Sequence, residues 1–163
     1  MRRILRRAAY RRERIYADTS VIGGCCDPEF REWSNALLRD FRRGAYALLV
    51  SELVSAEIAD APDEIQAVYA RFLESPYAKI LPITPEALAL AERYMQREIV
   101  TPKYSDDALH IALATTAGAD MVVSWNFRHI VHFDKIRAFN AVNHAADMKQ
   151  MMIHSPREVA KNG

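Results

Sequence analysis

Three acidic side chains lie at positions from which they could bind one metal ion together. Asp18 directly follows a short apolar segment, residues 15–17, and Glu57 interrupts the apolar stripe of a predicted helix. Asp107 stands with Asp106 at the start of another predicted helix. Two carboxylates ~5 Å apart repel each other by roughly 3 kcal/mol at an effective dielectric constant near 20, so such a group needs protons or a cation. Ligands that are all oxygen favour Mg²⁺ or Mn²⁺ over zinc.

Each of these acids also has an ordinary structural explanation when it is taken alone. The Asp-Thr-Ser sequence that begins at Asp18 is good turn chemistry. Glu57 could extend from the edge of its stripe into solvent. Asp106 and Asp107 are typical of a first helical turn, where the helix dipole favours negative charge. Successive helical residues point about 100° apart, so at most one of this pair faces a shared site, and periodicity does not choose between them.

A fourth polar position follows the apolar run "MVV". Ser124 and Asn126 are two residues apart, so along an extended segment their side chains point to the same side. All these polar residues follow predicted strands at or just beyond their carboxyl ends. In open α/β sheets, ligands bind outside the carboxyl ends of the strands. The combination of positions, rather than any one of them, predicts the site.

Strand-like and helix-like segments alternate along the chain. This alternation predicts a single α/β domain in which a central parallel sheet of four to five strands is flanked by helices. Ser51, Thr84 and Ser105 are predicted to cap helices, and Gly44 to end one. The predicted strands are 15–17, 45–51, 78–83, 120–125 and a short one near 152–153; the predicted helices are 27–44, 52–60, 63–75, 85–98, 106–119 and a further stretch in the tail.

Composition and charge bound the class of protein. The chain has 163 residues, half of them hydrophobic, which suits one globular domain with a real core. Residues 1–14 hold seven Arg and one acid, which leaves 15 basic and 20 acidic residues in the rest of the chain. We expect an Arg-rich extension over residues 1–13 that could be disordered, a folded domain over 14–158, and a short tail over 159–163. The extension could contact nucleic acid phosphates, but a frayed end or a start codon assigned too far upstream explains it as well.

Cellular location follows from segments that the sequence lacks. No apolar run is long enough to span a membrane, and no export signal is recognisable. Cys25 and Cys26 are adjacent and match no zinc or redox spacing, so they are predicted to be free thiols. His129 and His132 form an HxxH with no third ligand in view, which argues against zinc. The sequence therefore predicts a cytoplasmic protein that does not bind a membrane.

Four segments together resemble the PIN-domain family. They are "ADTSVI" (17–22), "VSELVSAEI" (50–58), "SDDALHIALA" (105–114) and "VVSWNFRHI" (122–130). Within that family the chain is most similar to ribonuclease toxins of VapC type, and the resemblance covers about residues 14–158. It implies an endoribonuclease that depends on Mg²⁺ or Mn²⁺, with RNA as the substrate. It also implies a small antitoxin as partner and a homodimer.

The resemblance assigns roles to the residues that match its motifs. Asp18, Glu57 and Asp107 correspond to the metal ligands of the family, and Ser124 to the hydroxyl residue that bonds the first aspartate. Asn126 corresponds to a catalytic position where many members have Asp, so the occupancy of a second metal is open. Asp106 is an additional acid with a supporting role at most.

Other functions fit less well or remain open. A phosphatase of the haloacid-dehalogenase kind needs a second acid where this chain has Ser20, and a response-regulator receiver needs paired acids and a later lysine. Two alternatives keep the PIN-like fold: a binding module with weak or no catalysis, and a housekeeping RNA-processing nuclease without an antitoxin.

Overall fold

The computed structural model describes residues 11–161 and contains one five-stranded sheet. All of the strand pairs in it are parallel, and the strand order is β3-β2-β1-β4-β5. This arrangement confirms the predicted α/β domain with a central parallel sheet. The strands are β1 (Arg14–Ala17), β2 (Ala47–Ser51), β3 (Ala78–Leu81), β4 (Met121–Val123) and β5 (Met152–His154).

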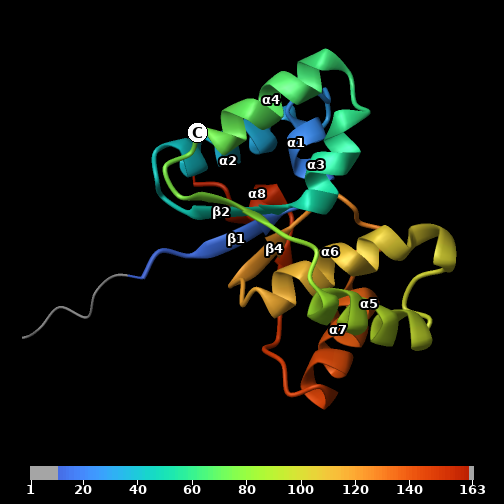
Figure 1. The fold of residues 1–163 in the computed structure, drawn as a ribbon. Coiled ribbons are helices and arrows are strands. Elements are labelled where there is room, and N and C mark those ends of the chain that lie inside the picture. Colours follow the sequence, from blue (N-terminus) through green and yellow to red (C-terminus); the bar gives the residue numbers. More distant parts are fainter. Residues whose placement is uncertain (1–10, 162–163) are drawn as a thin grey trace, which may run out of the picture.

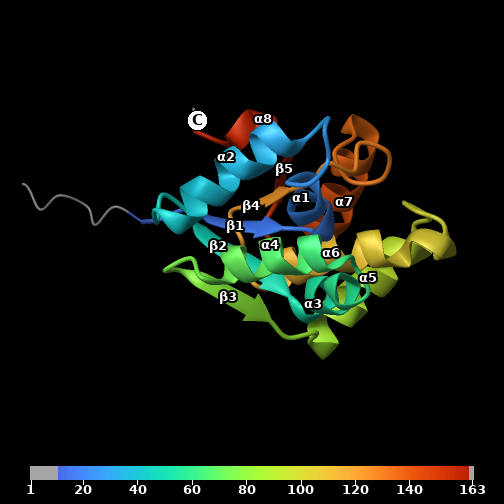
Figure 2. The ribbon, with the colours of Figure 1, turned by 90° about the horizontal axis from the view of Figure 1, so that it is seen from above.

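Helices cover both faces of the sheet (Figures 1 and 2). On one side, α1 contacts α2, α3 and α4, and α2 also contacts α8; on the other side, α5 packs against α6 and α7. The helices are α1 (Thr19–Gly24), α2 (Arg31–Arg42), α3 (Glu52–Ala59), α4 (Asp63–Leu73), α5 (Pro85–Gln96), α6 (Ser105–Thr116), α7 (Phe133–Ala145) and α8 (Pro156–Val159), and the 3₁₀ turn η1 (Pro102–Tyr104) leads into α6.

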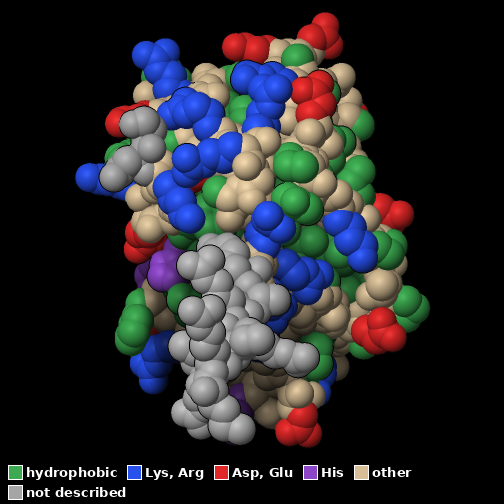
Figure 3. All heavy atoms as spheres, turned by 90° about the vertical axis from the view of Figure 1, so that its left-hand side faces the viewer, with side chains coloured by type: hydrophobic (Ala, Val, Ile, Leu, Met, Phe, Trp, Pro, Cys, Tyr) green, Lys and Arg blue, Asp and Glu red, His purple; other side chains and the backbone are tan. Residues whose placement is uncertain are grey.

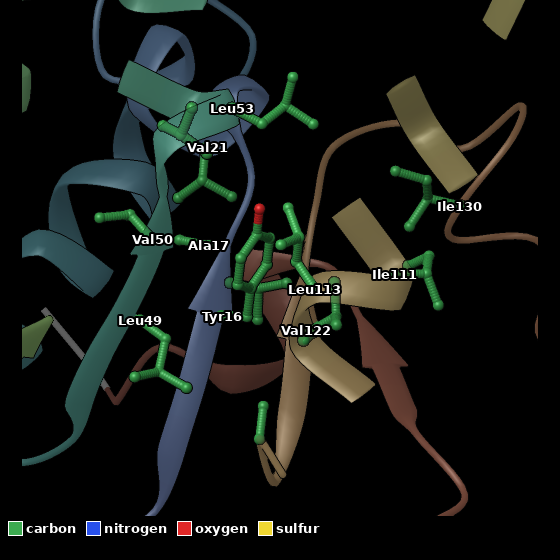
Figure 4. Close-up of a cluster of buried hydrophobic side chains, with 14 of the residues drawn as sticks. Tyr16, Ala17, Val21, Leu49, Val50, Leu53, Ile111, Leu113, Val122 and Ile130 are labelled. Carbon is green, nitrogen blue, oxygen red and sulfur yellow. The ribbon is translucent and has the colours of Figure 1, made fainter. Parts of the chain in front are cut away.

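The core surrounds the central strand. Tyr16 of β1 is fully buried, and Figure 4 shows its ring between Val50 of β2, Val122 of β4 and Leu113 of α6. A parallel strand that is covered on both faces reads as a continuous apolar run, which is the pattern of residues 15–17. The same burial isolates any polar group at the end of this strand from water.

The chain order of the strands creates a switch point at the middle of the sheet. From β1 the chain runs outward to β2 and β3, and it then returns to place β4 and β5 on the other side of β1. The order therefore reverses between β1 and β4. In open α/β sheets this switch point, at the carboxyl ends of the strands, is where ligands bind. Asp18 follows β1 and Ser124 follows β4, so both lie at the switch point.

Several predicted helix ends are confirmed. Ser51 and Thr84 accept hydrogen bonds from the backbone N–H groups of Val54 and Ala87, and they cap α3 and α5 as predicted. Gly44 has a φ of +77°, a left-handed conformation that favours glycine, just after α2. The two cysteines are free, as predicted.

Other element boundaries differ from the prediction. Ser105 was predicted to cap α6, but the helix begins at this residue and Tyr104 is the cap, without a side-chain hydrogen bond. The helix predicted from residue 27 begins only at Arg31, because the preceding residues form turns. The short helix α1 was not predicted at all, because the residues "TSVIGG" have low helix propensity.

The amino end of the described chain is attached to the domain. Arg12, which the sequence placed in the extension, donates to the carbonyl of Gly44 at 2.8 Å, and its guanidinium lies 3.7 Å from the ring centroid of Tyr77. Figure 3 shows that Lys and Arg side chains gather on this face, which is the left-hand side of Figure 1. The prediction for residues 1–10 lies outside the described residues. Across residues 11–161, no helix has the length and apolarity needed to cross a membrane.

Candidate active site

Asp18 is a buried carboxylate held by hydroxyl groups. It caps α1, and its side chain is 4% exposed. Ser20 Oγ donates to Oδ1 and Ser124 Oγ donates to Oδ2, both at 2.5 Å. Burial raises the pKa of Asp18, although His110 and the hydroxyl donors partly oppose the shift. A buried anion that lacks a full countercharge at this point would be stabilised by a cation.

Glu57 is linked through His110 to the central strand. Its Oε1 accepts from Nε2 of His110 at 2.7 Å, and the Nδ1 of that ring lies 2.7 Å from the Tyr16 hydroxyl. Tyr16 also bonds Ser51 Oγ at 2.8 Å, and Ser51 caps the helix that carries Glu57. The four side chains therefore form a chain of hydrogen bonds that runs from α3 through α6 and β1 to the end of β2.

His110 is the group on which the three acids converge electrostatically. Its side chain is buried, and burial disfavours its cation, but the hydrogen bond that it donates to Glu57 and the charges of the acids outweigh burial and raise its pKa. Asp18 and Asp107 both contribute to that shift. Burial opposes ionisation of Glu57 as well, but the hydrogen bond and charge of His110 lower its pKa overall.

Asp107 and Asp106 have different surroundings. Asp107 Oδ2 lies 3.0 Å from Nδ1 of His129, whose ring packs against Tyr104 at a centroid distance of 4.1 Å. Asp107 is partly buried, with a side-chain exposure of 21%. Asp106 is exposed, and its side chain makes no hydrogen bond or ion pair with any of residues 11–161. Of the two, only Asp107 contributes with Asp18 and Glu57 to the raised pKa of His110.

Asn126 belongs to a tight turn after β4. Its side-chain Oδ1 accepts from the backbone N–H groups of Arg128 at 3.2 Å and His129 at 2.9 Å. Its own N–H donates to Ser124 Oγ, the hydroxyl that also bonds Asp18. The residue therefore connects two sides of the site, with its carbonyl oxygen engaged by the turn.

Sequence reasoning missed several residues of this site. His110 and Tyr16 lie within apolar segments, whose pattern does not indicate that their polar atoms join the acids. The spacing of Asp107 and His110, one helical turn, is the one signal that could have located the histidine. Ser20, considered in the sequence only as a position that lacks an acid, donates to Asp18 and accepts from Trp125 N at 2.9 Å.

Thr19 is another residue that sequence reasoning missed. Its Oγ1 is buried without a hydrogen-bond partner of good geometry, yet it lies close enough to Glu57 to help lower the pKa of that acid.

The donor chemistry fits a divalent metal, but the acids are not assembled into a finished metal centre. The carboxylates and the nearby hydroxyls, among them Thr19 beside Glu57, offer oxygen ligands. Among residues 11–161, no group of three or more His, Cys, Asp or Glu side chains is arranged so that it could hold a metal ion. Glu57 and Asp107 are each engaged by a histidine.

Comparison with known proteins identifies the family. The model of the PIN domain matches residues 15–143, so the chain belongs to the PIN-domain family. No curated protein sequence matches the chain.

Solved structures show the same fold at low sequence identity. VapBC2 from Rickettsia felis, bound to a DNA fragment from its promoter, is 10% identical with a TM-score of 0.56, and the match covers 87% of this chain and 98% of that chain. FitAcB from Neisseria gonorrhoeae is 18% identical with a TM-score of 0.56, over 89% of this chain and 99% of that chain.

Proposed function

We propose that the protein is a divalent-metal-dependent endoribonuclease that hydrolyses RNA phosphodiester bonds. The observation that supports this most is the convergence of Asp18, Glu57 and Asp107 on His110 at the switch point of the sheet. The three acids come from separate elements and each contributes to the raised pKa of His110, and the buried Asp18 is energetically unfavourable as an isolated anion. Asp18 also caps α1, but an uncharged Asn or Ser could cap the helix as well, so capping alone does not require a buried charge.

Asp18, Glu57 and Asp107 are the proposed metal ligands. When Mg²⁺ or Mn²⁺ is bound, it supplies a Lewis acid and a water of lowered pKa for attack on phosphorus. Ser124 and Ser20 hold both oxygens of Asp18 in place. We propose that Asn126 orients the substrate through its amide N–H group, because its carbonyl oxygen is already used by the turn.

Cleavage of RNA by the purified protein tests this proposal. Structured RNAs incubated with Mn²⁺ should be cut, and EDTA should abolish the cut. Asp18→Asn keeps the size and capping ability of the side chain but removes its charge, so we expect at least about a 100-fold loss of kcat. Cleavage that survives both EDTA and the substitution would contradict the assignment.

A toxin role is the more specific form of the proposal. VapBC2 and FitAB were both solved with DNA, and VapBC2 with DNA from its own promoter. We propose by analogy that this chain is a cytoplasmic toxin that forms a homodimer and pairs with a small antitoxin. Finding a reading frame for a small DNA-binding protein beside the gene would support a toxin, and its absence would favour a housekeeping nuclease.

One observation favours a second candidate, a binding module without turnover. Each acid already has a protein partner: Asp18 the two serines, Glu57 a histidine, and Asp107 another histidine. A pocket satisfied in this way could hold a cationic side chain of a partner protein instead of a metal. The absence of cleavage with every divalent metal tested would favour this candidate.

A further inference from the structure

An exposed aromatic ring lies at the tip of the turn that borders the site. Phe127 is 49% exposed, although turn tips usually carry polar residues. It stands between Ser124, which bonds Asp18, and His129, which bonds Asp107. The turn that carries Phe127 therefore connects two residues that bond the proposed metal ligands.

The turn holds this ring in a fixed position. The Asn126 side chain bonds two backbone N–H groups of the turn, and its main-chain oxygen accepts from Ile130 N and Val131 N. These hydrogen bonds leave the loop little freedom. When a ligand contacts Phe127, the protein therefore loses little conformational entropy.

Packing beneath the ring adds to this rigidity. Phe127 lies edge-on to Trp125 at a centroid distance of 6.1 Å, and Trp125 stacks on Phe30 at 4.4 Å with an interplanar angle of 19°. The indole N–H of Trp125 donates to Ser34 Oγ at 2.8 Å. Phe127 is thus the outer member of a row of three aromatic rings, and its outer face is left to solvent.

Positive charge accompanies the aromatic rings at this rim. Arg128 is exposed, and its side chain makes no hydrogen bond or ion pair with the described part of the chain, residues 11–161. On the other side of His129, the Lys103 ammonium lies 5.5 Å from the ring centroid of Tyr104. The exposed ring of Phe127 and the cationic side chains of Arg128 and Lys103 would together suit a ligand that contains both a flat ring and an anion. A nucleotide has this chemistry.

We propose that Phe127 and Arg128 form a stacking subsite for an unpaired nucleobase next to the scissile phosphate. The proposal rests on the ribonuclease function above and adds the two residues that would hold one base of the RNA and its phosphate. Bases inside a duplex are stacked on their neighbours and cannot place a face on Phe127, whereas bases of loops and single strands can. Arg128 would then contact the adjoining phosphate.

Steady-state cleavage of a short oligoribonucleotide tests the subsite. Phe127→Ala should raise KM about 10- to 100-fold with little change in kcat, because stacking holds the substrate and does not act on phosphorus. Phe127→Trp should restore the wild-type KM. Phe133→Ala is the matched control, since Phe133 is 71% exposed at the start of α7 and should leave KM unchanged.

The substrate can be varied in the same way. Replacing the nucleotides beside the cleaved bond with abasic ones should raise KM for the wild type and have little further effect on Phe127→Ala. The same sequence annealed to its complement should be cut at least about 10 times more slowly.

The outcomes separate this inference from the proposed function. Cleavage by the wild type with equal KM for Phe127→Ala and Phe133→Ala would overturn the subsite and leave the nuclease intact. Equal cleavage of single strands and duplexes would also overturn it. A wild type that cuts no RNA with any metal would overturn both. A Phe127→Ala protein that keeps its KM for RNA but no longer binds a protein partner would assign the ring to that partner.

Discussion

At the scale of single residues, Asp18 shows the conflict between stability and chemistry. Its carboxylate is buried and its pKa is raised, so the folded protein disfavours the charged form. The pKa of an aspartic acid in the unfolded chain is 3.8. When folding raises the pKa of an acid, the free energy of unfolding decreases as the pH rises from the unfolded-state pKa to the folded-state pKa. The charge that the proposed chemistry needs therefore destabilises the fold near neutral pH.

Asp18→Asn should consequently be more stable than the wild type at neutral pH. Asn caps helices as well as Asp and has nearly the same shape, so the change removes the charge and turns one acceptor oxygen into an N–H donor beside the serine hydroxyls. We expect a gain of about 1 kcal/mol or more in the free energy of unfolding at pH 7. Urea unfolding from pH 4 to pH 8 measures it, and the gain should shrink as the pH falls. A variant that is less stable than the wild type at pH 7 would show that the buried charge is already compensated.

His110 tests whether the hydrogen-bonded chain positions Glu57. His110→Gln keeps a side-chain N–H that can reach Glu57, whereas His110→Leu removes it and leaves a half-buried carboxylate without its partner. We expect kcat to fall about 10-fold or less with Gln and about 100-fold or more with Leu. Equal losses in the two variants would show that His110 acts only through packing.

Tyr16→Phe breaks the same chain at its next link. Because Tyr16 has no direct contact with Glu57, a smaller effect on kcat is expected, about 3- to 10-fold. Tyr94→Phe is the control, since Tyr94 is a buried tyrosine whose hydroxyl bonds Asn143 away from the site. A kcat that falls equally in both variants would point to a general loss of packing.

The sequence predicted the site residues that interrupt an apolar pattern, and it missed the site residues whose rings fit such a pattern. Glu57 was found because an acid interrupts an apolar stripe, and Asp18 because an acid ends an apolar strand. His110 and Tyr16 satisfy the apolar pattern with their rings and join the site only through their polar atoms. Asn126 was read as part of an extended strand, but β4 ends at Val123 and a turn follows.

At the scale of elements, α1 connects the site to the aromatic row. A Cβ atom on Gly24 would lie 2.5 Å from Ser34 Oγ and 2.7 Å from Trp125 Nε1, so only glycine fits there. Trp125 in turn donates its backbone N–H to Ser20, which bonds Asp18. The close approach of α1 and Trp125 thus fixes the loop that carries Ser124.

Gly24→Ala should lower both stability and activity. We expect a loss of about 1–3 kcal/mol from overpacking, together with a fall in kcat, because Trp125 must move. Gly23→Ala lies in the same helix with no atom within 4 Å of the added Cβ, so it should be neutral or stabilise by up to about 1 kcal/mol. Thermal unfolding and RNA cleavage of the two variants provide the comparison. Equal effects would mean that the contact with Trp125 is unimportant.

Element types were predictable from the sequence where periodicity is strong, and boundaries were not. The five strands and the long helices follow from apolar runs and helical spacing. The helix α1 depends on a cap formed by Asp18 and on packing against α2, α3 and α4, neither of which a local pattern contains. Likewise Ser105 has the residue type of a cap, but η1 leads directly into α6 and places it in the first turn.

At the scale of the whole molecule, the site joins both helical layers through the sheet. Asp18 and Glu57 belong to the layer of α1 and α3, whereas Asp107 and His110 belong to α6 on the other side (Figure 1). A ligand that bridges these acids would hold the two layers together. Binding of a metal should therefore appear as a change in the stability of the entire domain, even without any RNA.

Mn²⁺ should raise the melting temperature of the wild type. A ligand that binds only the folded state stabilises it by about 2.7 kcal/mol at 100 times its dissociation constant. For a domain of this size, that corresponds to a rise in Tm of about 5 to 10 °C. Scanning calorimetry with and without Mn²⁺ measures the shift, and excess EDTA should reverse it.

Two neighbouring acids provide the control for this shift. Asp107→Asn should lose most of the rise in Tm, because Asp107 is the one of the pair that contributes with Asp18 and Glu57 to the raised pKa of His110. Asp106→Asn, with the same change in charge one residue away, should keep it, because Asp106 is exposed and unbonded within residues 11–161. If both variants kept the full rise, the metal would bind elsewhere. If Asp106→Asn alone lost it, the two aspartates would have to exchange their proposed roles.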